Sequence, residues 1–176
     1  MSFELSENIQ VNKSKYENKK EDILKSVFKI LEENNLLSLS TIRGIQPYSS
    51  SAYYSFDKYL NLYIWTEKNT RHSDNIEKNN KIAVNVADSS QKWGSLLKGL
   101  QMHGEAKIVS GTELIKAGTL YIKRFPKVFA YIKKISDFVS DEFKSVIYKL
   151  EINRVKLLDE KSFGKEEFIE ILISRR

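Results

Sequence analysis

The fold is indicated by residues 62–76, which read LYIWTEKNTRHSDNI. The segment opens with aliphatic residues at every second position, the pattern of a half-buried β-strand, and then changes to a helical pattern. Thr70 stands immediately before the helical pattern, and Arg71 and His72 lie in its first turn. The segment therefore predicts a strand that leads through a short connection into a helix.

The start of this helix is a candidate anion site. Helix N-termini present unpaired backbone N–H groups and a partial positive charge, so two potential cations there are unfavourable unless an anion binds. Backbone amides, the Thr70 hydroxyl and the Arg71 guanidinium would together form a phosphate site. Two plainer interpretations stay open at this point. In the first, Thr70 only caps the helix and Arg71 points to water. In the second, His72 is an ordinary surface residue.

Patterns of period two recur along the chain and predict a mainly antiparallel β fold. Besides the strand at 60–65, the strand-like stretches are 37–41, 47–56, 82–86, 100–108 and 146–152. Helical patterns cover 23–35 and 111–125, and another helical stretch follows Pro126. Six strands with helices between them and at the ends favour a small β-barrel over a parallel doubly wound sheet.

Two segments within this pattern carry unusual residues. Tyr53 and the neighbouring serines give one strand both stacking area and hydroxyl donors, although a half-buried strand with tyrosines at the core rim explains the same pattern. Gly99 and Gly104 interrupt the strand at 100–108, which indicates a bulge or a close approach by another group. Trp93 either caps a bound ring or anchors its own loop.

Composition limits the function classes further. The 176 residues suit one domain, which we expect over 20–176, with the polar residues 1–19 as a flexible arm. The absence of Cys excludes thiolate nucleophiles, disulfides and Cys-ligated metal, and with only two histidines no metal site is expected. No segment is long and apolar enough to cross a bilayer, so we expect a soluble, cytoplasmic protein without a membrane partner.

Three stretches carry a resemblance to a known family. They are residues 65–84, which contain Thr66-Glu67-x-x-Thr70-Arg71-His72, residues 98–105, which read KGLQMHGE, and residues 123–126, which read KRFP. In these stretches the chain resembles the pyridoxamine 5′-phosphate oxidase-like split-barrel flavoproteins, and within them a bacterial branch of YhbP type. The resemblance covers roughly residues 20 to 165 and implies a mainly β fold, a six-stranded antiparallel split β-barrel with flanking helices.

The resemblance also implies a homodimer that binds flavin mononucleotide (FMN) at the subunit interface. It places the flavin phosphate at Arg71 and Thr70, with His72 where many relatives have Lys, and the ring along the strand at 51–55. Gly99 stands where the oxidase has a flavin-contacting Gln, for which Gln101 is a candidate replacement. The implied cofactor-binding residues are Ser51, Ala52, Tyr53, Ser55, Thr66, Thr70, Arg71, His72, Trp93, Gly99 and Gln101.

The function expected from this resemblance is that of an FMN-dependent oxidoreductase or flavin reductase acting on a small molecule, with NAD(P)H as a candidate electron donor. Pyridoxamine phosphate oxidation is disfavoured, because the oxidase's C-terminal substrate-phosphate motif has no match here. The alternative is a split-barrel protein that binds haem or the deazaflavin F420, with His72 or His103 as a candidate iron ligand. Nucleic acid is a disfavoured partner, because the net charge of +6 is spread along the chain without a basic tract.

Overall fold

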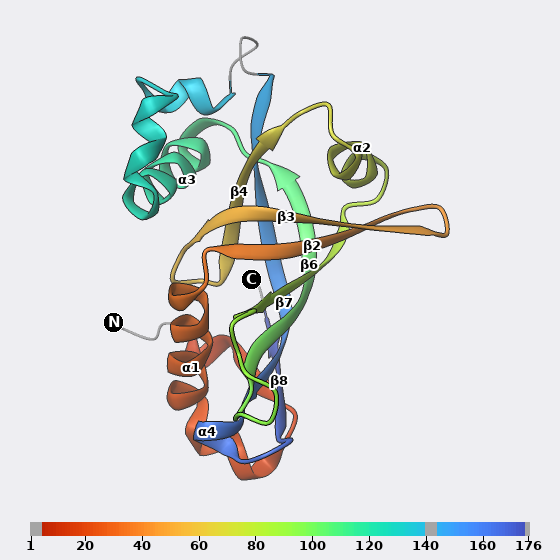
Figure 1. Cartoon of the computed structure of the whole chain (residues 1–176), viewed down its shortest axis with the longest axis vertical. Helices are drawn as coiled ribbons and strands as arrows, with labels where there is room; N and C mark the ends of the chain where they lie inside the picture. The colour runs from red at the N-terminus through yellow and green to blue at the C-terminus, as the bar shows by residue number, and fades with distance from the viewer. Residues whose placement is uncertain (1–4, 140–143, 175–176) are drawn as a thin grey trace.

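The computed structural model describes residues 5–139 and 144–174, and its centre is a closed antiparallel barrel (Figure 1). Around the barrel the strand order is β7-β4-β3-β2-β5-β6, and β6 pairs with β7 to close it. The six strands are β2 (Leu36–Arg43), β3 (Gln46–Phe56), β4 (Asn61–Glu67), β5 (Lys81–Ala87), β6 (Lys98–Ile108) and β7 (Ser145–Asp159). The predicted six-stranded barrel is confirmed.

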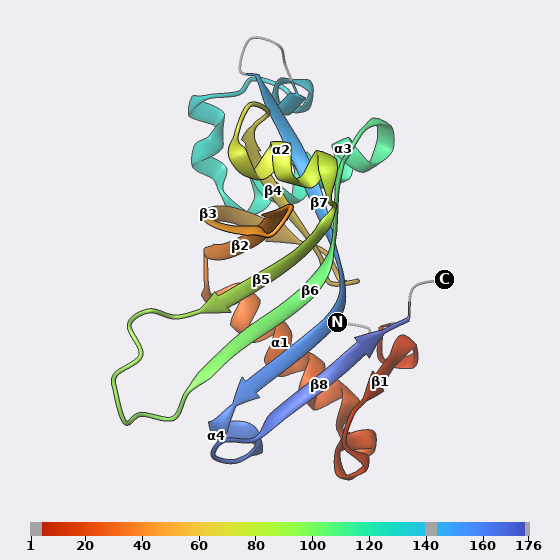
Figure 2. The ribbon, with the colours of Figure 1, turned by 90° about the vertical axis from the view of Figure 1, so that its right-hand side faces the viewer.

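Strand β7 is long enough to pair with two neighbours along one edge. Its first half, 145–151, pairs with β4, and residues 154–158 pair with β8 (Phe168–Ile173). The short strand β1 (Ile9–Val11) extends this second part of the sheet (Figure 2). A closed barrel and a small open sheet therefore share one strand.

The segment before the first long helix is packed. The sequence suggested a flexible arm over 1–19, but in the described part, 5–19, Leu5, Ile9 and Tyr16 are buried. Two 3-10 helices (Ser6–Asn8 and Ser14–Lys19) flank β1, and the Tyr16 ring packs edge-on against Phe163 at 5.7 Å. A few well-spaced apolar side chains are enough to hold a polar stretch against the sheet.

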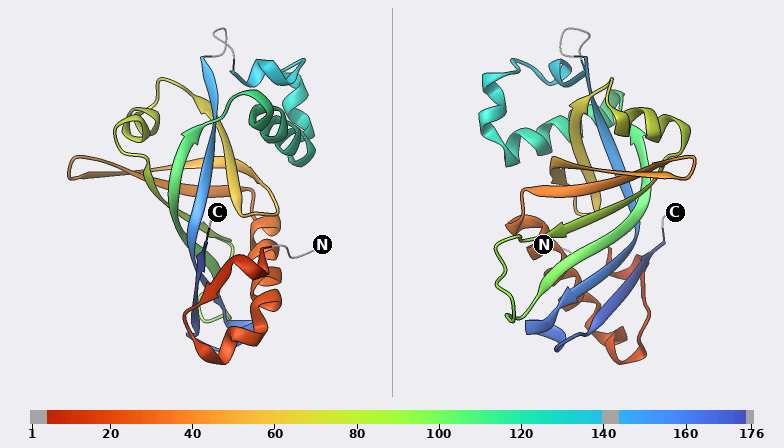
Figure 3. Two further views of the ribbon diagram at one scale, coloured as in Figure 1. Left: turned by 180° about the vertical axis from the view of Figure 1, so that it is seen from behind. Right: turned by 45° about the vertical axis from the view of Figure 1, so that its right-hand side comes forward.

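The barrel interior and the helices that close it form the main hydrophobic core. Alternate side chains of each strand point inward, as the period-two patterns predict. Helix α1 (Lys20–Glu33) buries one apolar face against this core, and α2 (Arg71–Lys78) follows β4 and contributes Ile76 to it. Figures 1 and 3 show α1 and α2 at different ends of the barrel.

A second, smaller core lies outside the barrel. Helix α3 (Gly111–Arg124) covers the outer face of β4 and β7, where Tyr63 and Ile147 are buried against it. The chain continues as two 3-10 helices (Pro126–Ala130 and Ile135–Val139) rather than as the longer helical stretch expected there. Pro126 cannot continue α3, so α3 ends before it and a new helical turn begins at the proline. A short helix α4 (Glu160–Phe163) links β7 to β8.

A β-bulge fixes the course of β6. The register of β6 against β7 shifts between His103 and Gly104, and a Cβ at residue 104 would overlap the backbone of Glu151. The expected role of this glycine, close backbone approach at a bulge, is confirmed. Within the described residues, no helix combines the length and the apolar character that a membrane crossing requires.

Candidate functional site

The turn from β4 into α2 is built around the Thr70 hydroxyl. Thr70 is the N-cap, and its Oγ1 accepts a hydrogen bond from the Ser73 backbone N–H at 3.3 Å. The same oxygen lies 2.9 Å from Ser73 Oγ, which in turn donates to the Glu67 carbonyl at 3.2 Å. The predicted capping role of Thr70 is confirmed, and a second hydroxyl, Ser73, ties the helix back to the end of the strand.

His72 lies inside this hydroxyl cluster. Its Nε2 is 2.9 Å from Thr66 Oγ1 and 3.0 Å from Thr70 Oγ1. Burial lowers the pKa of His72 below its ordinary value. The imidazole is therefore neutral at pH 7 and contributes hydrogen bonds, rather than positive charge, to the turn.

Arg71 supplies the positive charge of the turn. Its side chain is exposed, and its guanidinium lies 5.0 Å from the centre of the Tyr48 ring on β3. Among the described residues it forms no ion pair and no hydrogen bond. The exposed Asp74, also in the first turn, is the acidic group closest in sequence. An unpaired guanidinium at the positive end of a helix can receive an anion.

The second turn of α2 faces the barrel interior. Asn75 is fully buried, and its Nδ2 donates to Thr41 Oγ1 of β2 at 2.9 Å. Its Oδ1 is buried without a hydrogen-bond partner among the described residues, and so is Ser50 Oγ on β3. Buried polar atoms without a partner are uncommon in folded proteins, so this end of the barrel has hydrogen-bonding capacity to spare.

A second group of predicted residues lies on the outer face of the barrel. Cross-strand pairing places Ser51, Ser38, Asn85 and Gln101 in one row across β3, β2, β5 and β6. The next row along the strands is Ser49, Ser40, Ala83 and His103. Small and polar side chains therefore form a flat outer surface, with His103 exposed at its β6 side.

The other predicted residues of β3 have different environments. Tyr53 is 56% exposed on the outer face, where its ring packs edge-on against Phe125 at 5.5 Å. Ala52 packs against the barrel core. Ser55 is 1% exposed and lies beneath α3, away from the α2 turn.

Trp93 and Gly99 lie at the far end of β5 and β6. Gly99 pairs with Ala87, the last residue of β5, and Trp93 is fully exposed in the loop between the two strands. This loop projects at the end opposite α2 (Figure 2). A single chain therefore brings Thr66, Thr70, Arg71 and His72 together but leaves Trp93 and Gly99 apart from them.

Sequence reasoning missed three residues in or beside the α2 turn: Tyr48, Ser73 and Asn75. Ser73 carried a usable signal, because a hydroxyl three residues after an N-cap Thr lies within reach of the cap. Tyr48 and Asn75 carried none, since their roles depend on β3 and β2 meeting α2 in space. Within the described residues, no group of three or more His, Asp or Glu side chains could hold a metal ion.

Known proteins share this fold at low sequence identity. A candidate pyridoxamine 5′-phosphate oxidase from Listeria innocua is similar at a TM-score of 0.59 and 15% identity, over 77% of this chain and 98% of that one. A haem-binding protein from Mycobacterium smegmatis is similar at a TM-score of 0.66 and 16% identity, over 82% of this chain. The match spans only 55% of the haem-binding protein.

Sequence similarity is stronger. A UPF0306 protein of Yersinia pestis (strain Angola) is 34% identical over 110 residues, which are 62% of this chain and 74% of the relative. The family model for pyridoxamine 5′-phosphate oxidase matches residues 23–159, which include all the barrel strands and α2. The chain therefore belongs to the pyridoxamine 5′-phosphate oxidase-like family.

Proposed function

We propose that the chain is an FMN-binding flavoprotein with its phosphate site at the start of α2. The observation that carries the proposal is Arg71, whose exposed guanidinium has no acidic partner among the described residues and stands at the positive end of a helix. The donors at this turn suit a phosphate monoester, because a guanidinium and the backbone N–H groups of a helix N-terminus are offered together. Family membership supports FMN as the source of that phosphate.

The residues of the turn divide the work of binding. Arg71 would pair with the phosphate, and stacking on Tyr48 limits the positions that its guanidinium can take. His72 would stay neutral and hold Thr66 and Thr70 in place through Nε2. Asp74 would oppose the anion, which limits the affinity for a phosphate.

We further propose that the flat outer face of the barrel receives the flavin ring within a homodimer. The row that contains Ser51 and Gln101 offers hydroxyl and amide groups to the ring edge, and the exposed Tyr53 offers an aromatic surface beside it. Trp93 is fully exposed in the loop between β5 and β6, which lies apart from α2 (Figure 2), so a contact with the flavin would be made to the partner's cofactor. Light scattering of the purified protein tests the dimer.

In this proposal the activity is that of an oxidoreductase or flavin reductase acting on a small molecule, with NAD(P)H as a candidate donor. FMN, when bound, supplies hydride and electron transfer at its ring. The chain supplies the phosphate anchor, hydrogen bonds to the ring edge and the exclusion of water. No side-chain nucleophile is needed, which suits a chain without Cys.

The test compares FMN with riboflavin, which lacks the phosphate. We expect Arg71→Ala to weaken FMN binding at least tenfold, the effect of losing one charge-assisted phosphate contact, and to change riboflavin binding less than twofold. Asp74→Asn should tighten FMN binding two- to threefold. Flavin fluorescence titration measures both ligands.

Lys78→Ala is the matched control, because it removes one positive charge from the other end of the same helix. It should leave FMN affinity within twofold of the parent protein. Equal losses for FMN and riboflavin in Arg71→Ala, or an equal loss in Lys78→Ala, would contradict the phosphate assignment.

Haem is the second candidate ligand. The favouring observation is the exposed His103 imidazole on the flat outer face, together with the similarity to a haem-binding protein. His72 suits iron less well, because its Nε2 already lies against two hydroxyls. A Soret band that forms with haem and is lost in His103→Ala, while FMN fails to bind, would favour haem over FMN.

A further inference from the structure

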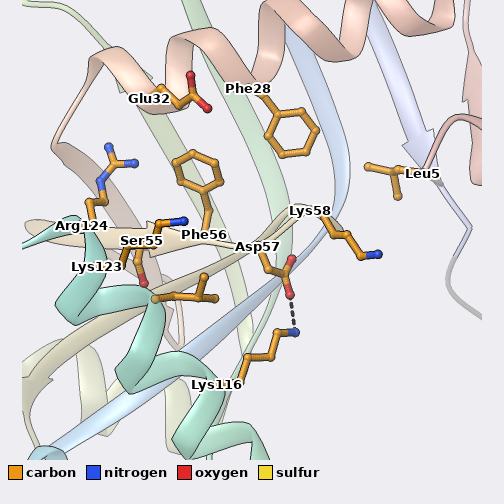
Figure 4. Close-up of a pocket in the computed structure, with 11 residues that line it drawn as sticks. Leu5, Phe28, Glu32, Ser55, Phe56, Asp57, Lys58, Lys116, Lys123 and Arg124 are labelled. Carbon is orange, nitrogen blue, oxygen red and sulfur yellow. Dashed lines mark hydrogen bonds and ion pairs between the residues drawn. The ribbon is translucent and has the colours of Figure 1, made fainter. Parts of the chain in front are cut away.

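A cavity separate from the α2 turn lies where α1, α3 and the end of β3 meet (Figure 4). Its volume is about 480 Å³, within the usual range of small-molecule sites. Phe28 of α1 and Phe56 of β3 form an aromatic wall, with their ring centres 6.1 Å apart. The cavity can therefore take the apolar body of a small ligand.

A buried hydroxyl group lines this cavity without a hydrogen-bond partner in the described part of the chain. Ser55 is 1% exposed, and its Oγ has no hydrogen-bond partner among the described residues. A buried hydroxyl without a partner costs free energy that a ligand oxygen could recover. Ser55, Lys123 and Arg124 all line the cavity (Figure 4).

Some of the cationic side chains that line the cavity are not used in ion pairs with described residues. Lys116 is committed to Asp57, with Nζ 2.6 Å from Oδ2. Lys123 forms no ion pair within the described part of the chain. Arg124 Nη2 donates to the carbonyls of residues 31 and 34 at 2.7 and 2.6 Å, while its Nε is buried without a partner. Glu32 is the remaining acid of the lining.

We propose that this cavity binds a small monocarboxylate with an apolar body. The carboxylate would take the unused donors at Ser55, Lys123 and Arg124, and the body would lie against the wall of Phe28 and Phe56. A single negative charge matches the site, because Glu32 and Asp57 also line it and would oppose a phosphate dianion. An amine would find only Glu32 as an acidic partner, since Asp57 is already paired with Lys116, and it would be repelled by Lys123 and Arg124.

The experiment is isothermal titration of the full chain with 3-phenylpropanoate, 3-phenylpropan-1-ol, 3-phenylpropylamine and inorganic phosphate, with octanoate as a second apolar body. We expect each chain to bind one molecule of either carboxylate. The alcohol, the amine and phosphate should each bind at least tenfold more weakly. Lys123→Gln should weaken carboxylate binding at least fivefold, and Ser55→Ala about threefold.

Both variants should fold, because neither side chain has a partner to lose, and unchanged melting temperatures check this. Lys92→Gln is the matched control, since Lys92 is exposed and lies outside the cavity lining. It should leave binding unchanged. Absence of binding by both carboxylates, equal binding of the alcohol, or carboxylate binding that Lys123→Gln leaves intact would each overturn the proposal.

Discussion

The two regions near the ends of β3 are built in different ways. The α2 turn, formed by Thr66, Thr70, Arg71, His72 and Ser73, comes from one short segment of the chain. The cavity lined by Phe28, Ser55 and Phe56, which we call the α3 cavity, combines the N-terminal segment, α1, β3 and α3. The first region is held by hydroxyls around a neutral imidazole, and the second by an ion pair and aromatic packing. A local turn reveals itself through spacing, whereas a cavity assembled from distant segments does not.

The largest expected effect comes from breaking the barrel that both regions share. Gly104→Ala would push a Cβ into the backbone of Glu151 at the bulge, and we expect a loss of about 4 kcal/mol or more in the free energy of unfolding. Chemical denaturation measures the loss. Gly99→Ala is the control, because its Cβ would lie 3.3 Å from the Val86 carbonyl oxygen, and it should cost about 1 kcal/mol. Equal stability of the two variants would contradict this account of the bulge.

The second-largest expected effect is a loss of stability that distinguishes the α3 cavity from the α2 turn. Asp57 is buried, accepts hydrogen bonds from the backbone N–H groups of Tyr59 and Asn61 at 2.9 and 3.0 Å, and pairs with Lys116. We expect Asp57→Ala to lower the free energy of unfolding by about 3 kcal/mol, because it leaves a cation and a turn without their acceptor. FMN affinity, measured on the folded protein, should be unchanged.

The pH dependence of stability gives a second readout for Asp57. Burial raises the pKa of this carboxyl, but hydrogen bonds from Asn61 and the Lys116 ammonium outweigh burial and hold it below its usual value. Its contribution is therefore present above the unfolded pKa of about 3.9 and is lost as pH falls through the folded pKa. Asp57→Asn should flatten the acid limb of the stability curve. An unchanged acid limb would show that other groups set it.

A smaller effect tests the cap of α2. Thr70→Ala removes the acceptor of the Ser73 N–H and the contact with His72, and we expect a loss of about 1 kcal/mol in the free energy of unfolding. Thr70→Ser keeps the hydroxyl and should retain most of that stability. If Thr70→Ser and Thr70→Ala lost equal stability, the loss would come from the missing methyl group rather than from the hydroxyl.

The smallest effect tests the neutral state of His72. Because burial lowers its pKa, the unfolded chain binds a proton more readily than the folded protein does. Stability from this group is full above the unfolded pKa near 6.5 and falls as pH drops toward the folded value. When the pH falls from 7.5 to 5, we expect the free energy of unfolding to decrease more in the parent protein than in His72→Gln. The difference should be less than about 1 kcal/mol. Equal losses in the parent protein and in His72→Gln would contradict the lowered pKa of His72.

Local chemistry explains why much of the α2 turn could be predicted. A hydroxyl residue before a helical pattern caps the helix wherever it occurs, so Thr70 required no knowledge of the rest of the fold. The period-two stretches likewise predicted the barrel strands, and Gly104 predicted the bulge. Tyr48 and Asn75 could not be predicted, because each acts through a contact with another element.

Tertiary structure also changed the interpretation of individual residues. Ser55 had the same sequence signal as Ser51, yet one lies beneath α3 and the other on the flat outer face. The period-two alternation of this strand could be predicted from the sequence, but the helix that covers only one end of β3 could not. The same holds for residues 5–19, where polar composition suggested a loose arm and packing against β8 decided otherwise.

By itself, the sequence determined the six barrel strands, the barrel class and the capped helix that carries Arg71, but not β1 and β8, because periodicity and capping depend on neighbouring residues. Only the tertiary structure decided that Arg71 stacks on Tyr48, that burial lowers the pKa of His72, and that Ser55 lines a cavity. These properties depend on burial and on which distant segments meet, and neither is written in the local order of the residues.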